Sequence, residues 1–408
     1  MSLTTILESQ RDSSLLFMQN ASAMVDYLKP TQLLSTDRSI VNDLKVEAPQ
    51  DGPALGRTVT WQLNVSDTLE NLYVAMHFDG ADNRTYVPLL GLKAIKSYRI
   101  MLGNETIHNV EDYASYMAAT MGMMDTDRVE QLLTAAGRTA TVALQATTVY
   151  APLPTFLDKM RIASNEKDNI FDLRDVNGRI RVQVTFRPED ELKAGTSVIP
   201  VVPKMDLYYS SVVFSEKQNE VELQAASDEI KDLFYKGIDV STSLTDIAIP
   251  NGETKSIDIS AYTGSQRLIA VVLRSANDVA NRFQPKYLNS TISVRAAGRD
   301  YYKLEGVAGS TPNAALESTQ SAINSLLNGY SSAPNLVSTD FTNKVFYIPI
   351  GIDSNMSRYA GGLNVSRISK TEIAIKNNTA APLYATVVMY TDALYQLNNR
   401  TIQRWIQA

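Results

Sequence analysis

One internal repeat constrains the fold of this 408-residue chain more than any other feature of its sequence. Segment 58–78 (TVTWQLNVSDTLENLYVAMHF) has the same order of strand-like and turn-like residues as segment 255–274 (KSIDISAYTGSQRLIAVVLR), and Leu72 aligns with Leu268 at an offset of 196. A repeat of this kind indicates that one structural unit occurs twice. A single matched pair of such low identity would carry little weight, so further pairs are needed.

Three further groups of segments supply that support. VYAPLP (149–154) corresponds to FYIPIG (346–351), with Tyr150 aligned to Tyr347 at an offset of 197. A further group matches 97–113 with 292–306, and the last group matches the two consecutive segments 179–186 and 205–214 with 371–378 and 381–390. Four matched groups in one order are difficult to produce by chance. We therefore interpret the chain as two copies of one β domain. The expected domains are a helical arm at 1–39, a first roll at 40–225, a second roll at 226–398 and a tail at 399–408.

The repeated segments are typical of antiparallel strands. Several alternate apolar and polar residues, as half-buried strands do. In the first copy these runs are 58–65, 71–78, 97–102, 139–153, 178–186 and 205–214. Asn177-Gly178 and Asn251-Gly252 precede two strand-like runs, and Asn-Gly is the preferred pair for tight hairpin turns. A chain of this kind is mainly β, with about eight strands in each copy, which predicts two tandem eight-stranded jelly rolls.

Helices are expected in three places. Apolar residues recur at helical spacing over 3–28, and Lys29-Pro30 ends that run. Each copy also contains a long excursion, at 103–138 and at 303–343, that includes helical patterns. These patterns are 111–124 and 125–137 in the first copy and 313–329 in the second. We expect both excursions at one end of the molecule. Immunoglobulin-like sandwiches seldom contain excursions of this length, so the jelly roll is favoured.

The composition excludes most kinds of chemical site. A net charge of −6 gives no general basic field for a polyanion, so we expect no sequence-specific nucleic-acid binding. The chain has no cysteine, which removes disulfides, thiolate-bound metals and thiol nucleophiles. It also has no Gly-Lys pair, so a P-loop is absent.

Few residues remain as candidates for catalysis. The two histidines, His77 and His108, each lie beside apolar residues, and we interpret both as structural. Acidic residues cluster at Glu189-Asp190-Glu191 and at Asp125 with Asp127, which we interpret as solvated loops. We therefore assign no catalytic, cofactor-binding or metal-binding residue, and expect no enzyme activity and no cofactor.

The order of these segments resembles that of the double jelly-roll major capsid proteins of icosahedral viruses. This family includes tailless membrane-containing phages, adenovirus-type hexons and large DNA viruses. SYRIMLGNETIH (97–108) is similar to a strand-plus-Gly element of the large-virus proteins, with Gly103-Asn104 in place of their Gly pair. VYAPLP (149–154) is similar to their aromatic–Pro–Leu strand end, and residues 382–403 are similar to the closing strand and tail of the phage proteins.

This resemblance implies a viral major capsid protein. Such a protein forms homotrimers, the trimers form pseudo-hexagonal capsomers, and the capsomers tile an icosahedral shell. The implied partners are neighbouring capsomers, minor capsid or penton proteins, and an internal membrane contacted by the N-terminal helix. The implied location is the virion, after synthesis in the host cytoplasm. In such a shell we expect the excursions to face outward and both termini to lie on the inner side.

Two other functions remain open at this point. The first is a carbohydrate-binding tandem β-sandwich, a lectin-like or adhesin-like surface protein. The charged residues Glu8, Arg11 and Asp12 precede the first apolar cluster, so we expect no secretory signal, which counts against this alternative. The second is a glycoside-acting enzyme on a jelly roll, which rests on fold analogy alone.

Overall fold

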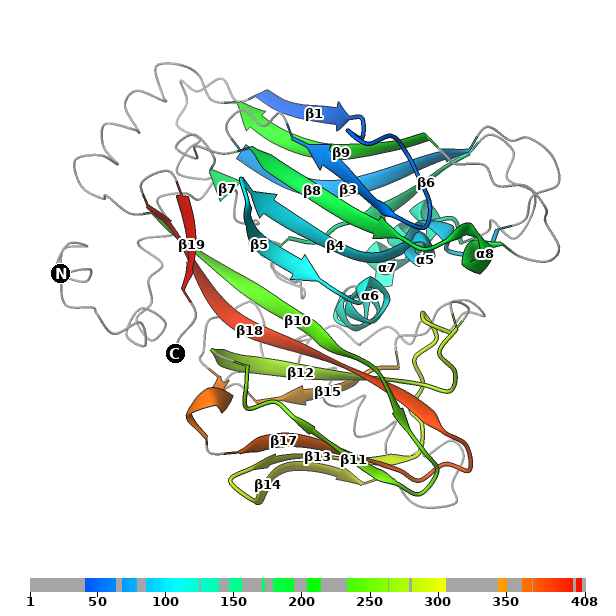
Figure 1. The fold of residues 1–408 in the computed structure, drawn as a ribbon, viewed down its shortest axis with the longest axis vertical. Helices are drawn as coiled ribbons and strands as arrows, with labels where there is room; N and C mark the ends of the chain where they lie inside the picture. Colours follow the sequence, from blue (N-terminus) through cyan, green and yellow to red (C-terminus); the bar gives the residue numbers. More distant parts are fainter. Residues whose placement is uncertain are drawn as a thin grey trace.

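The fold is described by a computed structural model and is mainly β (Figure 1). The described residues are 41–63, 68–78, 86–124, 126–138, 147–155, 171–172, 179–193, 204–213, 233–262, 264–278, 281–305, 344–350, 362–368, 370–398 and 401–405. The predicted helix over 3–28, the Asn177-Gly178 turn and most of the second excursion lie outside these ranges.

The first roll is a sandwich of two antiparallel sheets. One sheet has the order β1 (Val41–Glu47), β9 (Lys204–Val213), β3 (Thr68–Phe78) and β6 (Thr147–Pro152), and β7 (Phe171–Asp172) also pairs with β3. The other sheet has the order β2 (Thr58–Gln62), β8 (Ile180–Phe186), β4 (Ile95–Leu102) and β5 (Glu105–Val110). Along β8 every second residue is buried, which confirms the alternation expected of a strand with one face in the core.

The second roll repeats this arrangement strand for strand. Its first sheet has the order β10 (Leu233–Ile249), β18 (Leu383–Asn398), β12 (Ser265–Arg274) and β15 (Phe346–Pro349). Two further strands pair at its margins, β16 (Leu363–Asn364) with β12 and β19 (Thr401–Trp405) with β18. Its second sheet has the order β11 (Thr254–Asp258), β17 (Thr371–Asn377), β13 (Ser290–Ala296) and β14 (Arg299–Glu305), and η1 (Val365–Arg367) precedes β17. The predicted fold class, two tandem eight-stranded jelly rolls, is confirmed.

The strand register refines the alignment of the two copies. Leu72 and Leu268 lie in the equivalent strands β3 and β12, as the repeat predicts. However, Tyr73 pairs with Pro152 where Leu268 pairs with Pro349. Tyr73 is therefore the structural equivalent of Leu268, and the sequence alignment of this strand was wrong by one residue.

The glycine-containing turns agree only in part with the turns that the sequence predicts. Gly103, with φ of 59°, closes the hairpin between β4 and β5, and Ala297-Gly298 closes the equivalent hairpin between β13 and β14. Asn251-Gly252 does form a turn, in which Gly252 has φ of 73°. This turn leads from β10 to β11, which belong to different sheets, so the predicted hairpin there is wrong.

The first excursion contains helices as predicted, but one of them lies in an unexpected place. Its helices are α6 (Tyr113–Met121) and α7 (Thr126–Ala135). Two shorter described helices, α5 (Leu90–Ala94) and α8 (Glu189–Leu192), lie outside the excursion. Every residue of α6 is buried, and Figure 1 shows this helix between the two rolls. Helix α6 is therefore not exposed, and the expectation that the excursions face outward in a shell stays a prediction. Within the described residues, none of the helices has the length and hydropathy needed to cross a membrane.

The described part of the chain contains two hydrophobic cores. The second core lies inside the second roll, between its two sheets, and includes Ile269 and Ile375. The first core fills the first roll, surrounds α6 and continues into side chains of the second roll such as Val240, Tyr347 and Tyr390. The sheet β10–β18–β12–β15 is therefore buried on both faces, and all ten residues of β12 are buried.

Candidate functional site

The two histidines lie on different sheets of the first roll. His77 on β3 contacts Thr148 Oγ1 through Nδ1 at 2.8 Å and Asp206 Oδ2 through Nε2 at 3.2 Å. His108 on β5 is buried, and its Nε2 lies 3.3 Å from the Tyr98 hydroxyl. Nothing in this arrangement joins the two rings in one site. A structural role for both stays our interpretation.

The acidic clusters also lie apart from each other. Glu189-Asp190-Glu191 form the first turn of α8, where Asp190 Oδ1 accepts from Lys193 Nζ at 2.6 Å. Asp127 lies in the first turn of α7, and Asp125 is outside the described residues. Among the residues that the structure describes, no group of three or more His, Asp or Glu side chains is arranged to hold a metal ion.

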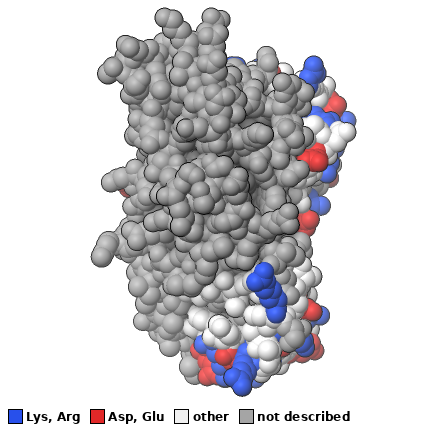
Figure 2. All heavy atoms as spheres, turned by 90° about the vertical axis from the view of Figure 1, so that its left-hand side faces the viewer, with Lys and Arg blue, Asp and Glu red and all other residues white. Residues whose placement is uncertain are grey.

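The surface charges that are visible are mixed in sign. At the lower end of Figure 2, where Figure 1 places β13, β14 and β17, Lys and Arg alternate with Asp and Glu. Strands β13 and β14 carry the exposed ion pairs Arg295 with Asp300 and Lys303 with Glu305, and Lys370 pairs with the partly buried Glu372. This part of the surface has no basic stripe of the kind that binds a nucleic-acid backbone.

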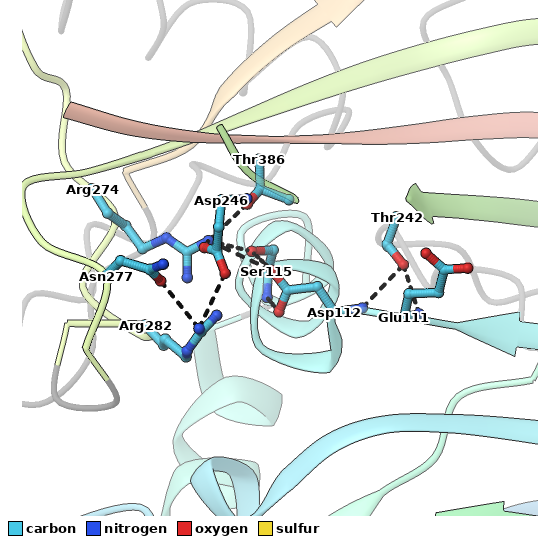
Figure 3. A network of polar contacts seen from close by, with 9 residues as sticks. All are labelled: Glu111, Asp112, Ser115, Thr242, Asp246, Arg274, Asn277, Arg282 and Thr386. Atoms are coloured by element: carbon cyan, nitrogen blue, oxygen red, sulfur yellow. Dashed lines mark hydrogen bonds and ion pairs between the residues drawn. The ribbon is translucent and has the colours of Figure 1, made fainter. Parts of the chain in front are cut away.

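The most elaborate polar cluster lies where the two rolls meet (Figure 3). Arg274, the last residue of β12, has no solvent-exposed surface. Its Nη2 donates to Ser115 Oγ of α6 at 3.0 Å, to Asp246 Oδ1 of β10 at 3.1 Å and to Thr386 Oγ1 of β18 at 2.7 Å. One guanidinium therefore joins two strands of the second roll to the helix of the first.

A second arginine completes this cluster. Arg282 Nη2 donates to Asp246 Oδ2 and to Asn277 Oδ1, at 3.1 and 3.0 Å. Asp246 thus accepts from two arginines, one at each carboxylate oxygen. Two cations in this partly buried region are matched by Asp246, which is 25% exposed, and by the buried Asp112, whose Oδ2 lies 3.5 Å from Arg274 Nη2. Buried charges are tolerated when they are paired in this way.

The N-terminus of α6 is held from both sides. Asp112 is its N-cap and accepts from Ser115 N at 3.3 Å and from Ser115 Oγ at 2.6 Å. The backbone N–H groups of Glu111 and Asp112 both donate to Thr242 Oγ1 of β10. Burial raises the pKa of Asp112, but Arg274, the hydrogen bonds from Ser115 and the charge of Arg282 outweigh it and place the pKa below its ordinary value of 3.8.

The rest of α6 packs against tyrosines of the second roll. The Tyr347 hydroxyl on β15 donates to the Ala119 carbonyl at 2.6 Å, and Tyr390 on β18 lies beside Thr120. A Cβ atom on Gly122 would lie only 2.1 Å from the Tyr347 hydroxyl, so glycine is what permits this approach. Burial raises the pKa of both phenols well above the ordinary value.

A polar cavity of about 370 Å³ lies next to the contact between Glu111 and Thr242. Its walls come from β5 and β10, with additions from the loop before β12 and from β18. The side chains that line it include Thr106, Asn109, Glu111, Asp239, Ser241 and Gln266. His108 also lines this cavity, and these groups can hydrogen-bond to water or to a small polar molecule.

Sequence reasoning did not single out the cluster between the rolls. Two signals were available. Residues 113–121 (YASYMAATM) have no charged face, which is typical of a helix buried on all sides. Arg274 ends a strand that is otherwise largely apolar, and an arginine there needs a partner from elsewhere in the fold.

Comparisons with known proteins identify the fold. No protein-family model and no curated protein matches the sequence. Among solved structures, the chain is similar to VP54 of the virus PBCV-1, which was fitted into a cryo-EM reconstruction of the virophage Sputnik. The TM-score is 0.66 and the identity 11%, over 91% of this chain and 97% of that one.

Two other solved structures give the same result. A chain of the PBCV-1 virus capsid matches with a TM-score of 0.65 and 11% identity, over 91% of this chain and 97% of that one. The major capsid protein of Faustovirus matches with a TM-score of 0.52 and 8% identity, over 94% of this chain and 98% of that one. The chain therefore has the fold that these viral capsid proteins have, as its sequence pattern predicted.

Proposed function

We propose that this chain is a viral major capsid protein whose homotrimers form pseudo-hexagonal capsomers and tile an icosahedral shell. The shared fold supports the proposal, because its solved examples build virus capsids. The proposed role is structural, without enzyme activity, and its location is the virion after synthesis in the host cytoplasm.

The observation that carries the proposal is the way in which the two rolls pack. The sheet β10–β18–β12–β15 of the second roll lies against α6 and the β5 edge of the first roll, so different surfaces of the two similar units meet. Such a head-to-tail contact can be repeated from chain to chain. If the rotation closes, the result is a ring. Three chains would supply six similar rolls, which match the six sides of a hexagonal tile.

The remaining details of the proposal follow from the sequence. We propose the domain boundaries 40–225 and 226–398, with the arm 1–39 and the tail 399–408 contacting neighbouring capsomers, minor capsid or penton proteins, or an internal membrane. Part of that tail, β19, pairs with β18, so it also extends a sheet of the second roll.

Native mass measurement and negative-stain imaging of the purified full-length chain test this function. We expect three copies per particle and a hexagonal outline. A monomer would overturn the proposal, and a monomer retained on a glycan column would favour the carbohydrate-binding alternative instead.

A further inference from the structure

The sheet β2–β8–β4–β5 of the first roll (Figure 1) carries a group of arginines on its outer face. Every second residue of β8 is buried, so Arg181 and Gln183 point outward, and the strand register places Arg99 of β4 beside Gln183. Arg179, just before β8, donates through Nη1 to Gln62 Oε1 of β2 at 3.4 Å. These five residues are called the arginine face below. Arg99 and Arg179 are exposed, and Arg181 is half-buried.

Neutral groups of the same sheet hold the arginines in place. Arg99 Nε donates to Gln183 Oε1, and Gln183 Nε2 donates in turn to Thr60 Oγ1 at 3.4 Å. Arg181 Nη2 donates to Asn104 Oδ1 at 2.9 Å. The guanidinium groups are therefore oriented before any partner binds, and this lowers the entropy that binding costs.

The charges of the arginine face are not neutralised by neighbouring acids. Among the residues that the structure describes, none forms an ion pair with its three arginines. This holds for Glu105 and Glu111 too, which lie at the two ends of β5. The face therefore keeps three positive charges on a chain whose net charge is −6.

The second roll neutralises an arginine at the equivalent place. The hairpins β4–β5 and β13–β14 fix the correspondence between the two sheets. Arg295 forms ion pairs with Asp300 at 2.9 Å and with Glu372 at 3.7 Å. In the first roll, Thr106 occupies the position of Asp300, and Arg181 occupies that of Glu372. The first roll thus has a neutral residue and a cation where the second roll has two acids.

The spacing of the arginines matches an extended acidic chain. Arg179 and Arg181 are two residues apart on one extended segment, which places their Cα atoms about 7 Å apart. Arg99 is the diagonal neighbour of Arg181 on β4, at about 7–8 Å. Alternate residues of an extended peptide are also about 7 Å apart and point to one side. Because an arginine binds a carboxylate through two parallel hydrogen bonds, a peptide with an acid at every second position fits this face.

Other polyanions fit this face less well. The aromatic residues of its four strands, Trp61, Tyr98 and Phe186, are all buried, so none can stack on a nucleic-acid base. Nucleic acids and anionic membranes are bound through many cations, whereas this face has three, each held by a neighbouring amide. Arginine is also enriched, and lysine depleted, where two proteins meet. These properties favour a protein partner.

We propose that the arginine face binds an acidic segment of a second, different protein. The segment lies on the face in an extended conformation and pairs alternate Asp or Glu side chains with Arg99, Arg179 and Arg181. The inference rests on the proposed function for the kind of partner, which in a capsid is a minor protein that attaches to the capsomer. Because the second roll lacks this face, each chain offers one such site.

Fluorescence anisotropy with a labelled synthetic peptide tests the contact. The probe has Asp at alternate positions with Thr between them, and the control peptide has Asn in place of every Asp. We expect the Asp peptide to bind the full-length chain at one site per chain, with an affinity that falls as salt is added, and the Asn peptide not to bind.

Matched variants locate the binding site. Arg99→Gln combined with Arg181→Gln should weaken binding of the Asp peptide at least about tenfold while thermal unfolding stays the same. Arg295→Gln, an exposed change on the second roll, should leave peptide binding unchanged. Equal binding of both peptides, or equal binding by the wild type and the double variant, would overturn the inference.

Further outcomes separate this partner from the others. Oligothymidine or phosphatidylserine vesicles that bind at the arginine face, without binding of the Asp peptide, would overturn the inference in favour of a polyanion. A native mass that the double variant changes would overturn it in favour of a second copy of this chain. A hexagonal trimer that does not bind the Asp peptide would overturn this inference alone. A monomer that binds the peptide through the arginine face would overturn the proposed function and leave the binding site.

Discussion

Arg274 shows how a single buried charge can specify the contact between two similar domains. Its guanidinium is fully removed from solvent and is matched by Asp112, Asp246 and two hydroxyl groups. Such a cluster adds little net stability compared with an apolar contact of the same shape. It does penalise a placement of α6 away from Arg274, because Asp112 would then lose the arginine with which it pairs.

Replacing Arg274 should therefore destabilise the chain strongly. Arg274→Met leaves the buried carboxylate of Asp112 without its arginine partner, and we expect a loss of about 3–5 kcal/mol in the free energy of unfolding. Arg295→Met is the matched control, because Arg295 is exposed and its ion pair should be worth at most about 1 kcal/mol. Urea unfolding compares the two. Equal losses would show that the buried cluster is unimportant.

The same cluster predicts a dependence of stability on pH. The pKa of Asp112 is lowered in the folded chain, so its ionised form stabilises the fold above pH 3.8, and that contribution is lost as pH falls through the lowered value. Asp112→Asn should be less stable than wild type at pH 6, and this difference should shrink as pH falls to 3 and below. Urea unfolding at several pH values measures it. A difference that stays constant would contradict the assignment.

At the scale of single elements, α6 is the part of the fold whose role is least visible in the sequence. Its helical character follows from residues 113–121, but nothing in this segment states that β12, β15 and β18 will cover it. The strands were easier to predict, because alternation along β8 and β2 is a local property. The one-residue error at Leu72 arose from matching side chains by type, whereas register depends on strand pairing.

Gly122 gives a direct test of the packing between α6 and β15. Gly122→Ala places a methyl group against the Tyr347 hydroxyl and should cost about 1–3 kcal/mol. Tyr347→Phe removes that hydroxyl, so the double variant should recover part of the loss, with a coupling energy of about 1 kcal/mol. Thermal or urea unfolding of the four proteins supplies the cycle. Purely additive losses would show that the two residues do not meet.

For the whole molecule, the shared core predicts that both rolls unfold together. Side chains of the first roll, α6 and the face of the second roll belong to one continuous core. We expect a single calorimetric transition whose calorimetric and van't Hoff enthalpies agree. In the Tyr347→Ala variant, which weakens the contact with α6, the transition should broaden. Two separate transitions in the wild-type chain would mean that the rolls are independent domains.

The sequence could reveal that the molecule has two similar halves, but not how those halves differ. It aligned Tyr150 with Tyr347 correctly, because both lie in the same kind of strand end. Tyr347 is buried under α6, whereas Tyr150 is partly exposed. This difference depends on where the neighbouring roll lies. This information belongs to the assembled chain and not to either segment.

The position of α6 also affects how the chain folds while it is being synthesised. A ribosome completes β9 at Val213 and must add the 169 residues 214–382 before β18 begins at Leu383. At about 5–20 residues per second this takes roughly 10–30 s. During that interval the nascent first roll carries an apolar helix whose covering strands have not yet been synthesised. The half-made chain is therefore the species most exposed to chaperones and to aggregation, and its vulnerability ends only when β18 has been synthesised.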